Sequence, residues 1–400
     1  MGHYIAEREH GAIMEPRNQL PGHPKEMTRP AGLWSRLLEL LLWLNVVLAV
    51  LTFFVAGMTI DRYLKFSGTG TYKQMHVPAQ REHLPKSFYD SDELSGYSYD
   101  IVPDILHLVR YNATEVDFID VVAFRSMYLN HRPEKIYVHC SPCGFQGNYT
   151  RFPEGINFTF IPAVFPTEVF GIPIKVSHHA TDVLRLRALM RYGGYYCDKD
   201  VFVIQSLRRF LRYEASLNFE GGVNMGNMVM FFHKNSRFLR LYLDTYRRLN
   251  VSVWYYNAGE VPAKVLFQPH PHLVHRMHYG LETGMDMLNV LYEPHAYPYW
   301  RNAFAIHLLS RFRWSLPIDA LHGAAFNETN IRDVDNAFGE MARSVLFGTS
   351  AFVPPEAPIL SVAELAARKD RGEDLTSMRP GNERPFFYPM INVTKFKRHH

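Results

Sequence analysis

Cysteine is scarce in this sequence, with 3 residues in 400, so a scaffold built from disulfides is excluded. Neither sign of charge dominates, because 43 Lys and Arg stand against 39 Asp and Glu, for a net charge of +4. That balance does not indicate nucleic acid as the main partner. The 25 glycines and 25 prolines follow no period, which excludes a collagen-like chain. With 47% hydrophobic and 20% charged residues, the chain is not wholly disordered either.

One long hydrophobic run is present near the N-terminus. Leu40 to Ile60 contains 21 residues without a charge, and as a helix it would span ~31 Å, enough for the core of a bilayer. A buried helix of a soluble domain rarely lacks a polar face. A cleaved signal peptide would have a shorter apolar stretch, whereas here 39 residues precede the run and Asp61 and Arg62 follow it. We therefore predict one N-terminal transmembrane helix, an uncleaved signal anchor at residues 37–60.

The orientation of this anchor is predicted from glycosylation sequons. Basic residues flank the run on both sides, so the positive-inside rule does not decide. Every N-x-[ST] sequon lies after the run: they are at Asn112, Asn148, Asn157, Asn250, Asn327 and Asn392. We infer a cytosolic tail at residues 1–36, a polar stem at 61–99 and a C-terminal domain in the secretory lumen, as in a type II membrane protein of the Golgi.

Two of the three cysteines are close together. Cys140 and Cys143 form a C-x-x-C motif in a predicted loop, where a tight disulfide or two free thiols are the main alternatives. A zinc half-site would need a second pair, and only Cys197 remains. A thioredoxin-like motif would need a following helix, which the sequon at Asn148 argues against.

Apolar runs typical of buried strands alternate with segments of helical spacing from about residue 100 onward. The runs predict strands at 104–110, 135–140, 157–161 and 195–204, and the spacing predicts helices at 116–130 and 181–192. This alternation predicts an α/β domain with a mostly parallel sheet, in which ligands bind at the carboxyl ends of the strands. We place the domain at residues 100–345 and a C-terminal extension at 346–400.

The acidic motif D-x-D occurs three times, and only one copy has an informative context. Two copies, at 90–92 and 333–335, lie in polar stretches and are interpreted as solvated surface. The third, Asp198-Lys199-Asp200, follows a helix with Thr181 as expected N-cap, the turn Gly193-Gly194 and an aromatic strand. Two carboxylates in an otherwise buried segment are costly unless something neutralises them.

A divalent cation is one way to neutralise this pair. In an extended segment residues i and i+2 face the same way, so Asp198 and Asp200 can converge while Lys199 points away. Convergent carboxylates without a thiolate or imidazole cage suit Mn²⁺ or Mg²⁺. The alternative is a strand end held by salt bridges, for instance to Arg185 or Arg191, and the residue chemistry alone leaves both open.

The preceding helix favours a phosphate-containing ligand. Asp182, Arg185, Leu186 and Leu189 share one helix face, so a helix that buries the two leucines presents Asp182 and Arg185 at its N-terminal end. The free N–H groups and positive dipole of such an end suit a diphosphate.

The stretch from Ser177 to Ile204, SHHATDVLRLRALMRYGGYYCDKDVFVI, resembles the DXD sugar-binding region of a family of retaining glycosyltransferases. That family includes α-1,4-galactosyltransferase, α-1,4-N-acetylglucosaminyltransferase and the yeast initiating α-1,6-mannosyltransferase. Its pattern is matched in order by Asp182, Arg185, Leu189, Gly193, Gly194, Tyr196, Asp198 and Asp200. A weaker likeness extends from Ile101 to about Arg313, and the resemblance implies a nucleotide-sugar-binding fold of the GT-A type.

The resemblance also implies roles for individual residues. Asp200 would coordinate Mn²⁺ (or Mg²⁺) directly. Asp198 would contact either the ribose or, through a water molecule, the metal. His307 would be a third metal ligand or a contact of the diphosphate. Asp182 and Arg185 would bind the nucleotide sugar, for which the expected nucleotide is UDP.

The remaining implied features concern the substrate pocket. Asn224 matches a position in the donor or acceptor pocket. Transfer with retention can use front-side attack or a covalent carboxylate, for which Glu220 and Glu260 are the candidates. The expected acceptor is a glycan on a lipid or a protein. Two other classes stay open: an inactive lumenal glycan-binding or scaffolding protein of the same fold, and a metal-dependent phosphohydrolase, which would need more ligands near the acidic pair.

Overall fold

The computed structural model describes residues 43–45, 96–220, 224–253, 255–277, 280–282, 284–285, 287–294, 298–316 and 318–376. The chain divides into two units, Met1–Tyr72 and Lys73–His400, and the second contains all the elements below. Apart from 43–45, the predicted tail and anchor lie outside the described residues, as does nearly all of the stem. Within the described ranges, no helix combines the length and the apolar character that crossing a membrane requires.

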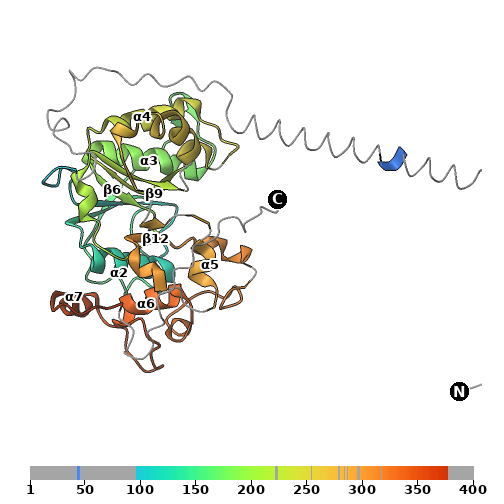
Figure 1. Cartoon of the computed structure of the whole chain (residues 1–400). Helices are drawn as coiled ribbons and strands as arrows, with labels where there is room; N and C mark the ends of the chain where they lie inside the picture. The colour runs from blue at the N-terminus through green and yellow to red at the C-terminus, as the bar shows by residue number, and fades with distance from the viewer. Residues whose placement is uncertain are drawn as a thin grey trace, which may run out of the picture. The chain divides into compact units, whose positions relative to one another are not determined.

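A seven-stranded sheet organises the second unit (Figure 1). Four of its six neighbouring strand pairs are parallel, and the antiparallel pairs are those of β9 with β6 and with β8. The predicted α/β class with a mostly parallel sheet is therefore confirmed. In spatial order the strands are β10 (His275–Met277), β8 (Ala215–Glu220), β9 (Asn224–Phe232), β6 (Gly194–Cys197), β1 (Ile105–Tyr111), β2 (Lys135–Ser141) and β3 (Phe158–Pro162).

A smaller sheet adjoins the large one. It contains β11 (Leu281–Glu282), β12 (Ala305–His307) and β7 (Val201–Val203), and β12 pairs antiparallel with β7. The register places His307 opposite Val201, the residue that follows the acidic motif. A separate hairpin joins β4 (Glu168–Val169) to β5 (Ile172–Pro173).

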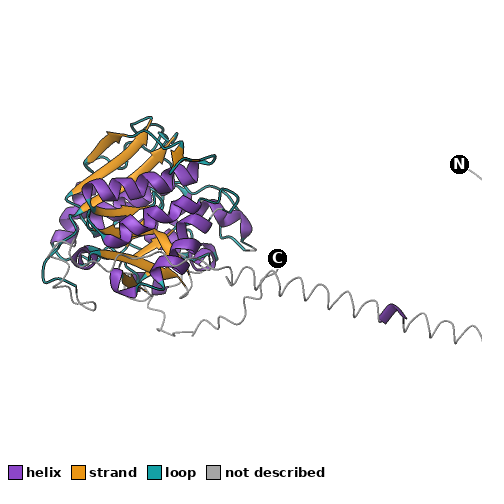
Figure 2. Cartoon of the chain, turned by 90° about the horizontal axis from the view of Figure 1, so that it is seen from above, coloured by secondary structure: helices purple, strands orange, loops and turns teal. Residues whose placement is uncertain are grey.

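Helices cover both faces of the large sheet. In Figure 1 helices α3 and α4 lie on one side and α2 and α6 on the other, and Figure 2 shows the helices and strands of the domain from above. The longer helices are α2 (Phe118–Asn130), α3 (Ser177–Tyr192), α4 (Arg237–Thr245), α5 (Met287–Tyr292), α6 (Ala337–Phe347) and α7 (Val362–Asp370). The short 3-10 and π turns are η3 (Arg208–Arg212), η4 (Tyr246–Arg248), η5 (Tyr256–Glu260), η6 (Ala263–Phe267), η7 (Pro271–Leu273), η8 (Pro298–Asn302), η9 (Ser310–Ser315) and η10 (Asn330–Arg332).

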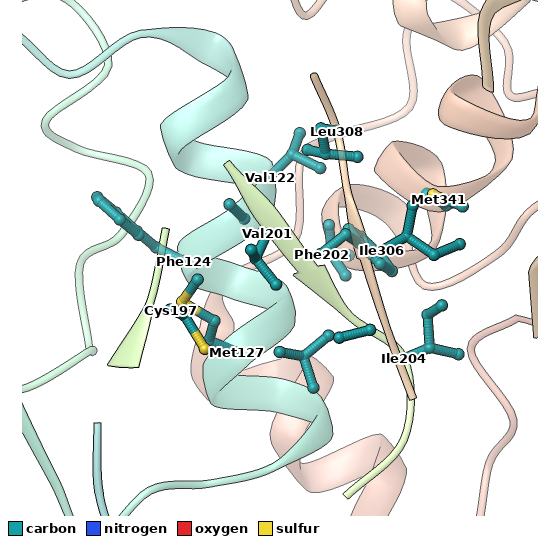
Figure 3. Close-up of a cluster of buried hydrophobic side chains, with 14 of the residues drawn as sticks. Val122, Phe124, Met127, Cys197, Val201, Phe202, Ile204, Ile306, Leu308 and Met341 are labelled. Atoms are coloured by element: carbon teal, nitrogen blue, oxygen red, sulfur yellow. The ribbon is translucent and has the colours of Figure 1, made fainter. Parts of the chain in front are cut away.

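The hydrophobic core joins the two sheets through α2. Figure 3 shows Val122 and Met127 of α2 near Val201 of β7. Ile306 of β12 lies beside Phe202, with Met341 of α6 next to it. All three residues of β7 are buried, so this short strand is apolar on both faces. Burial of each such side chain contributes roughly 1.5–3 kcal/mol, which fixes the position of the acidic motif immediately before β7.

The C-terminal segment belongs to the same core. Val362 and Leu365 of α7 and Leu375 pack in the cluster that contains the buried residues of α2. The domain boundaries predicted at residues 100 and 345 remain predictions.

The structure changes two predictions around the acidic motif. Helix α3 begins at Ser177 rather than near Thr181, and its N-cap, Val176, makes no side-chain cap hydrogen bond. Thr181 as an N-cap was therefore wrong; its hydroxyl donates to the carbonyl of His178 at 2.7 Å. The strand predicted at 195–204 is two strands, because β6 belongs to the large sheet and β7 to the small one. The acidic motif is the link between them.

The other local predictions hold. Gly193 ends α3 with φ 69°, and Gly194 begins β6 with φ 102°, conformations that favour glycine. Cys140 and Cys143 form a disulfide, whereas Cys197 is a buried free thiol. In the copy of D-x-D at 333–335, Asp333 is exposed, as expected for solvated surface, whereas Asp335 is half-buried. The copy at 90–92 lies outside the described residues.

Candidate active site

The acidic motif is a backbone turn held at both ends by hydrogen bonds. The N–H of Asp198 donates to the carbonyl of Met228 in β9 at 2.8 Å, and the N–H of Val201 donates to the carbonyl of Asp198 at 3.2 Å. The N–H of Leu308 donates to the carbonyl of Asp200 at 2.8 Å. The turn is therefore tied to the large sheet on one side and to the β12 end on the other. The expectation of a continuous extended strand was wrong, although the expected convergence of the two carboxylates is present.

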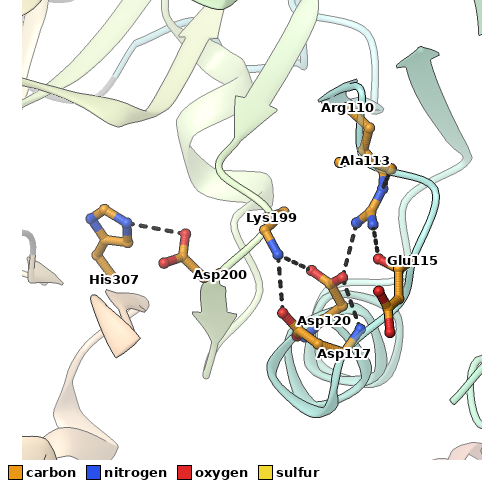
Figure 4. A network of polar contacts seen from close by, with 8 residues as sticks. All are labelled: Arg110, Ala113, Glu115, Asp117, Asp120, Lys199, Asp200 and His307. Carbon is orange, nitrogen blue, oxygen red and sulfur yellow. Dashed lines mark hydrogen bonds and ion pairs between the residues drawn. The ribbon is translucent and has the colours of Figure 1, made fainter. Parts of the chain in front are cut away.

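Three side chains come together at this turn. Asp198, Asp200 and His307 each offer a ligand atom, and these atoms all lie within 4.8 Å of one another. Nε2 of His307 is 3.1 Å from Oδ1 of Asp200 and 3.9 Å from Oδ2 of Asp198. All three side chains are partly exposed, at 16–23%. Figure 4 shows His307 directed at Asp200 across the gap between the two segments.

Asp200 and His307 shift each other's protonation. Burial alone would raise the pKa of Asp200, but the adjacent His307 lowers the pKa of that carboxyl to about 2. Burial alone would lower the pKa of His307, and the charge and hydrogen bond of Asp200 raise it instead. The carboxylate is consequently ionised over the whole physiological pH range.

The donor set fits a divalent cation. Carboxylate oxygens suit Mg²⁺ and Mn²⁺, and an imidazole nitrogen adds affinity for a first-row metal such as Mn²⁺. Three protein ligands leave several coordination positions for water or for phosphate oxygens of a substrate. Within the described part of the chain, this is the one group of His, Cys, Asp and Glu with suitable spacing.

Asp182 and Arg185 lie next to this group, but not at the end of a helix. Because α3 starts at Ser177, both residues are beyond its first turn, and the prediction that they sit at its N-terminal end was wrong. Both are buried. Nη2 of Arg185 is 3.0 Å from Oδ1 of Asp182, and Nη1 is 3.3 Å from Oδ1 of Asp198.

Arg185 is held by neutral groups as well. It donates to the carbonyl of Asn227 at 3.1 Å, and its guanidinium lies 4.4 Å from the ring centre of Tyr196. Burial acts to lower the pKa of Arg185, and Tyr196, Asp198 and Asp182 together raise it above its usual value. The salt-bridge reading of the acidic pair is thus correct for Asp198 and Arg185. Arg191 instead lies over the ring of Tyr192.

The pocket residues predicted from the resemblance are only partly described. Asn224 begins β9 and pairs in register with Glu220 of β8, and the side chains of both lie outside the described part. Glu260 is described, and one of its carboxylate oxygens is 2.8 Å from Nζ of Lys264.

Sequence reasoning missed two contacts of the motif. The hydroxyl of Tyr196 donates to Oδ1 of Asp198 at 2.5 Å, and Nζ of Lys199 is 2.9 Å from Oδ1 of Asp120 in α2. The first could have been found, because Tyr196 and Asp198 are two residues apart at the end of a strand and so share a face. The second joins residues 79 apart, and no local pattern indicates it.

Comparison with known proteins defines the class. Residues 159–217 match the family model described as "Glycosyltransferase sugar-binding region containing DXD motif". This range includes α3, the glycine turn and the whole acidic motif. The resemblance drawn from Ser177–Ile204 is confirmed, and the enzyme class that this region indicates is that of the glycosyltransferases.

Individual relatives are more distant. The glucan organizing enzyme 1 of Cryptococcus neoformans var. grubii is 26% identical in the aligned region, which covers 43% of this chain and 51% of the relative. The chain thus spans about half the length of that curated relative. Among solved structures, the apo form of the glycosyltransferase GlyE of Streptococcus pneumoniae aligns with a TM-score of 0.39 at 8% identity, over 68% of this chain and 64% of that one. The galactosyltransferase LgtC, in complex with donor and acceptor sugar analogs, aligns with a TM-score of 0.32 at 16% identity, over 63% and 98%.

Proposed function

We propose that the protein is a metal-dependent, retaining glycosyltransferase of the GT-A type. It would move a hexose or N-acetylhexosamine from a nucleotide sugar, UDP-linked, to a glycan acceptor on a lipid or a protein. The observation that carries this proposal is the convergence of Asp198, Asp200 and His307 to within 4.8 Å, although His307 and Asp200 are 107 residues apart. The match of residues 159–217 to a sugar-binding region supports the same class.

In this proposal Asp200 and His307 hold the cation, Mn²⁺ or Mg²⁺, and Asp198 contacts it with Oδ2 or through water. Oδ1 of Asp198 already accepts from Tyr196 and lies beside Arg185, so one oxygen remains for the cation. When bound, the cation supplies electrostatic stabilisation of the charge on a departing diphosphate. The protein's part is to fix the ligands before the donor arrives.

In this proposal the donor pocket lies on the side of Asp198 that Arg185 contacts, away from His307. Asp182 and Arg185 bind the nucleotide sugar, and Arg185 at the same time orients Asp198. Asn224 contributes to the donor or acceptor pocket. Glu260 is engaged by Lys264, so a covalent route through Glu260 would need this ion pair to open, and front-side attack needs no such change.

The proposed location is the Golgi membrane, with the catalytic domain in the lumen and the anchor at residues 37–60. Three sequons of the described part support it, because Asn112, Asn148 and Asn157 are exposed and so open to glycan attachment. Glycosidase treatment of the protein expressed in animal cells should increase its mobility on a gel. An unchanged band would contradict the lumenal placement.

The activity is tested with the full-length protein in detergent and a panel of UDP- and GDP-sugars. We expect Mn²⁺-dependent release of nucleotide from one donor, faster in the presence of a glycan acceptor, and no release by Asp200→Asn. Stabilisation by UDP with no turnover of any donor would favour a glycan-binding protein of the same fold. No response to either nucleotide, with or without metal, would overturn the proposal.

A further inference from the structure

The middle residue of the acidic motif points away from the two carboxylates. Nζ of Lys199 lies 2.9 Å from Oδ1 of Asp120 and 3.3 Å from Oδ2 of Asp117, both at the start of α2 (Figure 4). Asp120 is fully buried, whereas the side chain of Lys199 is 39% exposed. The ammonium group therefore reaches inward to a carboxylate that has no access to water.

Asp120 is shared between two cations. Its Oδ1 accepts a hydrogen bond from Nζ of Lys199. Its Oδ2 accepts from Nη1 of Arg110 at 3.0 Å and from the N–H of Asp117 at 3.2 Å. In the reciprocal hydrogen bond, Oδ1 of Asp117 accepts from the N–H of Asp120 at 2.8 Å. The two bonds together form a capping box for α2. The cluster contains two positive and two negative side chains, and loss of Lys199 would leave it with a net negative charge.

Arg110 extends this cluster into the loop between β1 and α2. Its Nε donates to the carbonyl of Ala113 at 2.8 Å, and Nη2 donates to the carbonyl of Glu115 at 2.5 Å. Arg110 is buried, so these bonds fix the loop at the carboxyl end of β1. Lys199 thus connects the acidic turn to the first strand, the loop that follows it and the start of α2.

We propose that Lys199 is a positioning residue for the metal ligands, which rests on the proposed function of Asp198 and Asp200. The turn is tied to β12 by the bond between Leu308 and the carbonyl of Asp200, and Lys199 ties it on the opposite side to α2. Two anchors on opposite sides limit rotation of a three-residue turn and so keep both carboxylates convergent. Groups that orient metal ligands in this way typically change metal affinity 10–100-fold when they are removed.

A second effect of this contact concerns charge. A lysine between two carboxylates could fold back and pair with them, in competition with a cation. Because Asp120 and Asp117 engage Nζ, the ammonium stays on the α2 side of the turn. Lys199 therefore leaves the carboxylate oxygens of Asp200 available on the other side.

The test is titration of the full-length protein with Mn²⁺, read by calorimetry and by the electron paramagnetic resonance of free Mn²⁺. We expect Lys199→Met to bind Mn²⁺ about 10-fold more weakly than the wild type. Lys199→Arg, which can still reach Asp120, should stay within about 3-fold. Thermal unfolding of each variant controls for loss of fold, and Lys199→Gln, which is uncharged and shorter than lysine, replaces Lys199→Met with the same expected loss of affinity if the latter unfolds.

Lys369→Met is the matched control. Lys369 is also partly exposed and its Nζ lies 2.5 Å from Oδ1 of Asn130, at the other end of α2. Its replacement removes a lysine contact to the same helix and should leave Mn²⁺ affinity unchanged. Equal affinity in Lys199→Met and the wild type would overturn the role of Lys199 and leave the proposed metal site intact. Absence of Mn²⁺ binding in the wild type would overturn both.

Discussion

The hydroxyl of Tyr196 donates a hydrogen bond of 2.5 Å to Oδ1 of Asp198. Burial raises the pKa of Tyr196 well above its usual value, so the phenol stays protonated and can only donate to the carboxylate. Oδ2 of Asp198 faces the other way, 3.9 Å from Nε2 of His307. The carboxylate of Asp198 thus has one oxygen that fixes its orientation and one that is left for a ligand.

Replacement of Tyr196 by Phe tests this division. Tyr196→Phe removes the hydroxyl and keeps the ring under Arg185, so we expect a loss of roughly 1 kcal/mol in the free energy of unfolding, typical of one hydrogen bond. Sugar-transfer activity should fall about 10-fold, because Asp198 can rotate. Steady-state kinetics with the identified donor measure this effect, and unchanged kinetics would show that the bond does not orient Asp198.

Arg185 is expected to matter for stability as well as for activity. Arg185→Met leaves Asp182 and Asp198 without their shared cation in a buried region, which should cost roughly 3 kcal/mol. Urea denaturation measures this change. The control is Arg371→Met, which removes an exposed ion pair with Glu373 and should cost less than about 0.5 kcal/mol. Equal midpoints for the two variants would contradict the structural role of Arg185.

The residues of the site could be predicted from the sequence better than the geometry in which they are held. Asp198 and Asp200 were identified from their context, and the turn of Gly193-Gly194 from composition. The start of α3 was placed too late, because Val176 makes no side-chain cap hydrogen bond and leaves no signal. The break between β6 and β7 was missed because both strands are apolar, and only pairing with distant strands separates them.

The other features of the site that the sequence did not predict depend on long-range contacts. His307 was assigned to the metal by resemblance, and its approach to Asp200 depends on the register of β12 with β7, which no local pattern encodes. The contact of Lys199 with Asp120 depends in the same way on where α2 begins. The salt-bridge and metal readings of Asp198 were treated as alternatives, yet its two oxygens allow both.

A buried histidine pair predicts how stability depends on pH. Nε2 of His107 donates to the carbonyl of Gly193 at 2.8 Å, so its Nδ1 accepts from Nε2 of His139 at 2.9 Å and both rings are neutral. Burial, and then the neighbouring His139, lower the pKa of His107 to about 3. Burial, and then Arg191, lower the pKa of His139 to about 4.

Because these pKa values are below the ordinary value of about 6.5, the unfolded chain binds protons that the folded chain does not. The stabilisation is present above about pH 6.5 and is lost as the pH falls toward 4, by roughly 2 kcal/mol per imidazole at pH 5. Urea denaturation at pH 7 and pH 5 should show a smaller difference for His139→Gln than for the wild type. The control variant is His322→Gln, at an exposed position, which should show the same difference in stability between pH 7 and pH 5 as the wild type. A wild-type protein with equal stability at both pH values would contradict this account.

The central claim is that Asp198, Asp200 and His307 hold one divalent cation, and direct Mn²⁺ binding tests it most closely. Calorimetric titration of the full-length protein should give one Mn²⁺ per chain, and Asp200→Asn should weaken binding by a factor of about 100 or more. Asp333→Asn, in the copy of the motif at 333–335, should bind as the wild type does. Equal affinity in Asp200→Asn and the wild type would contradict the claim.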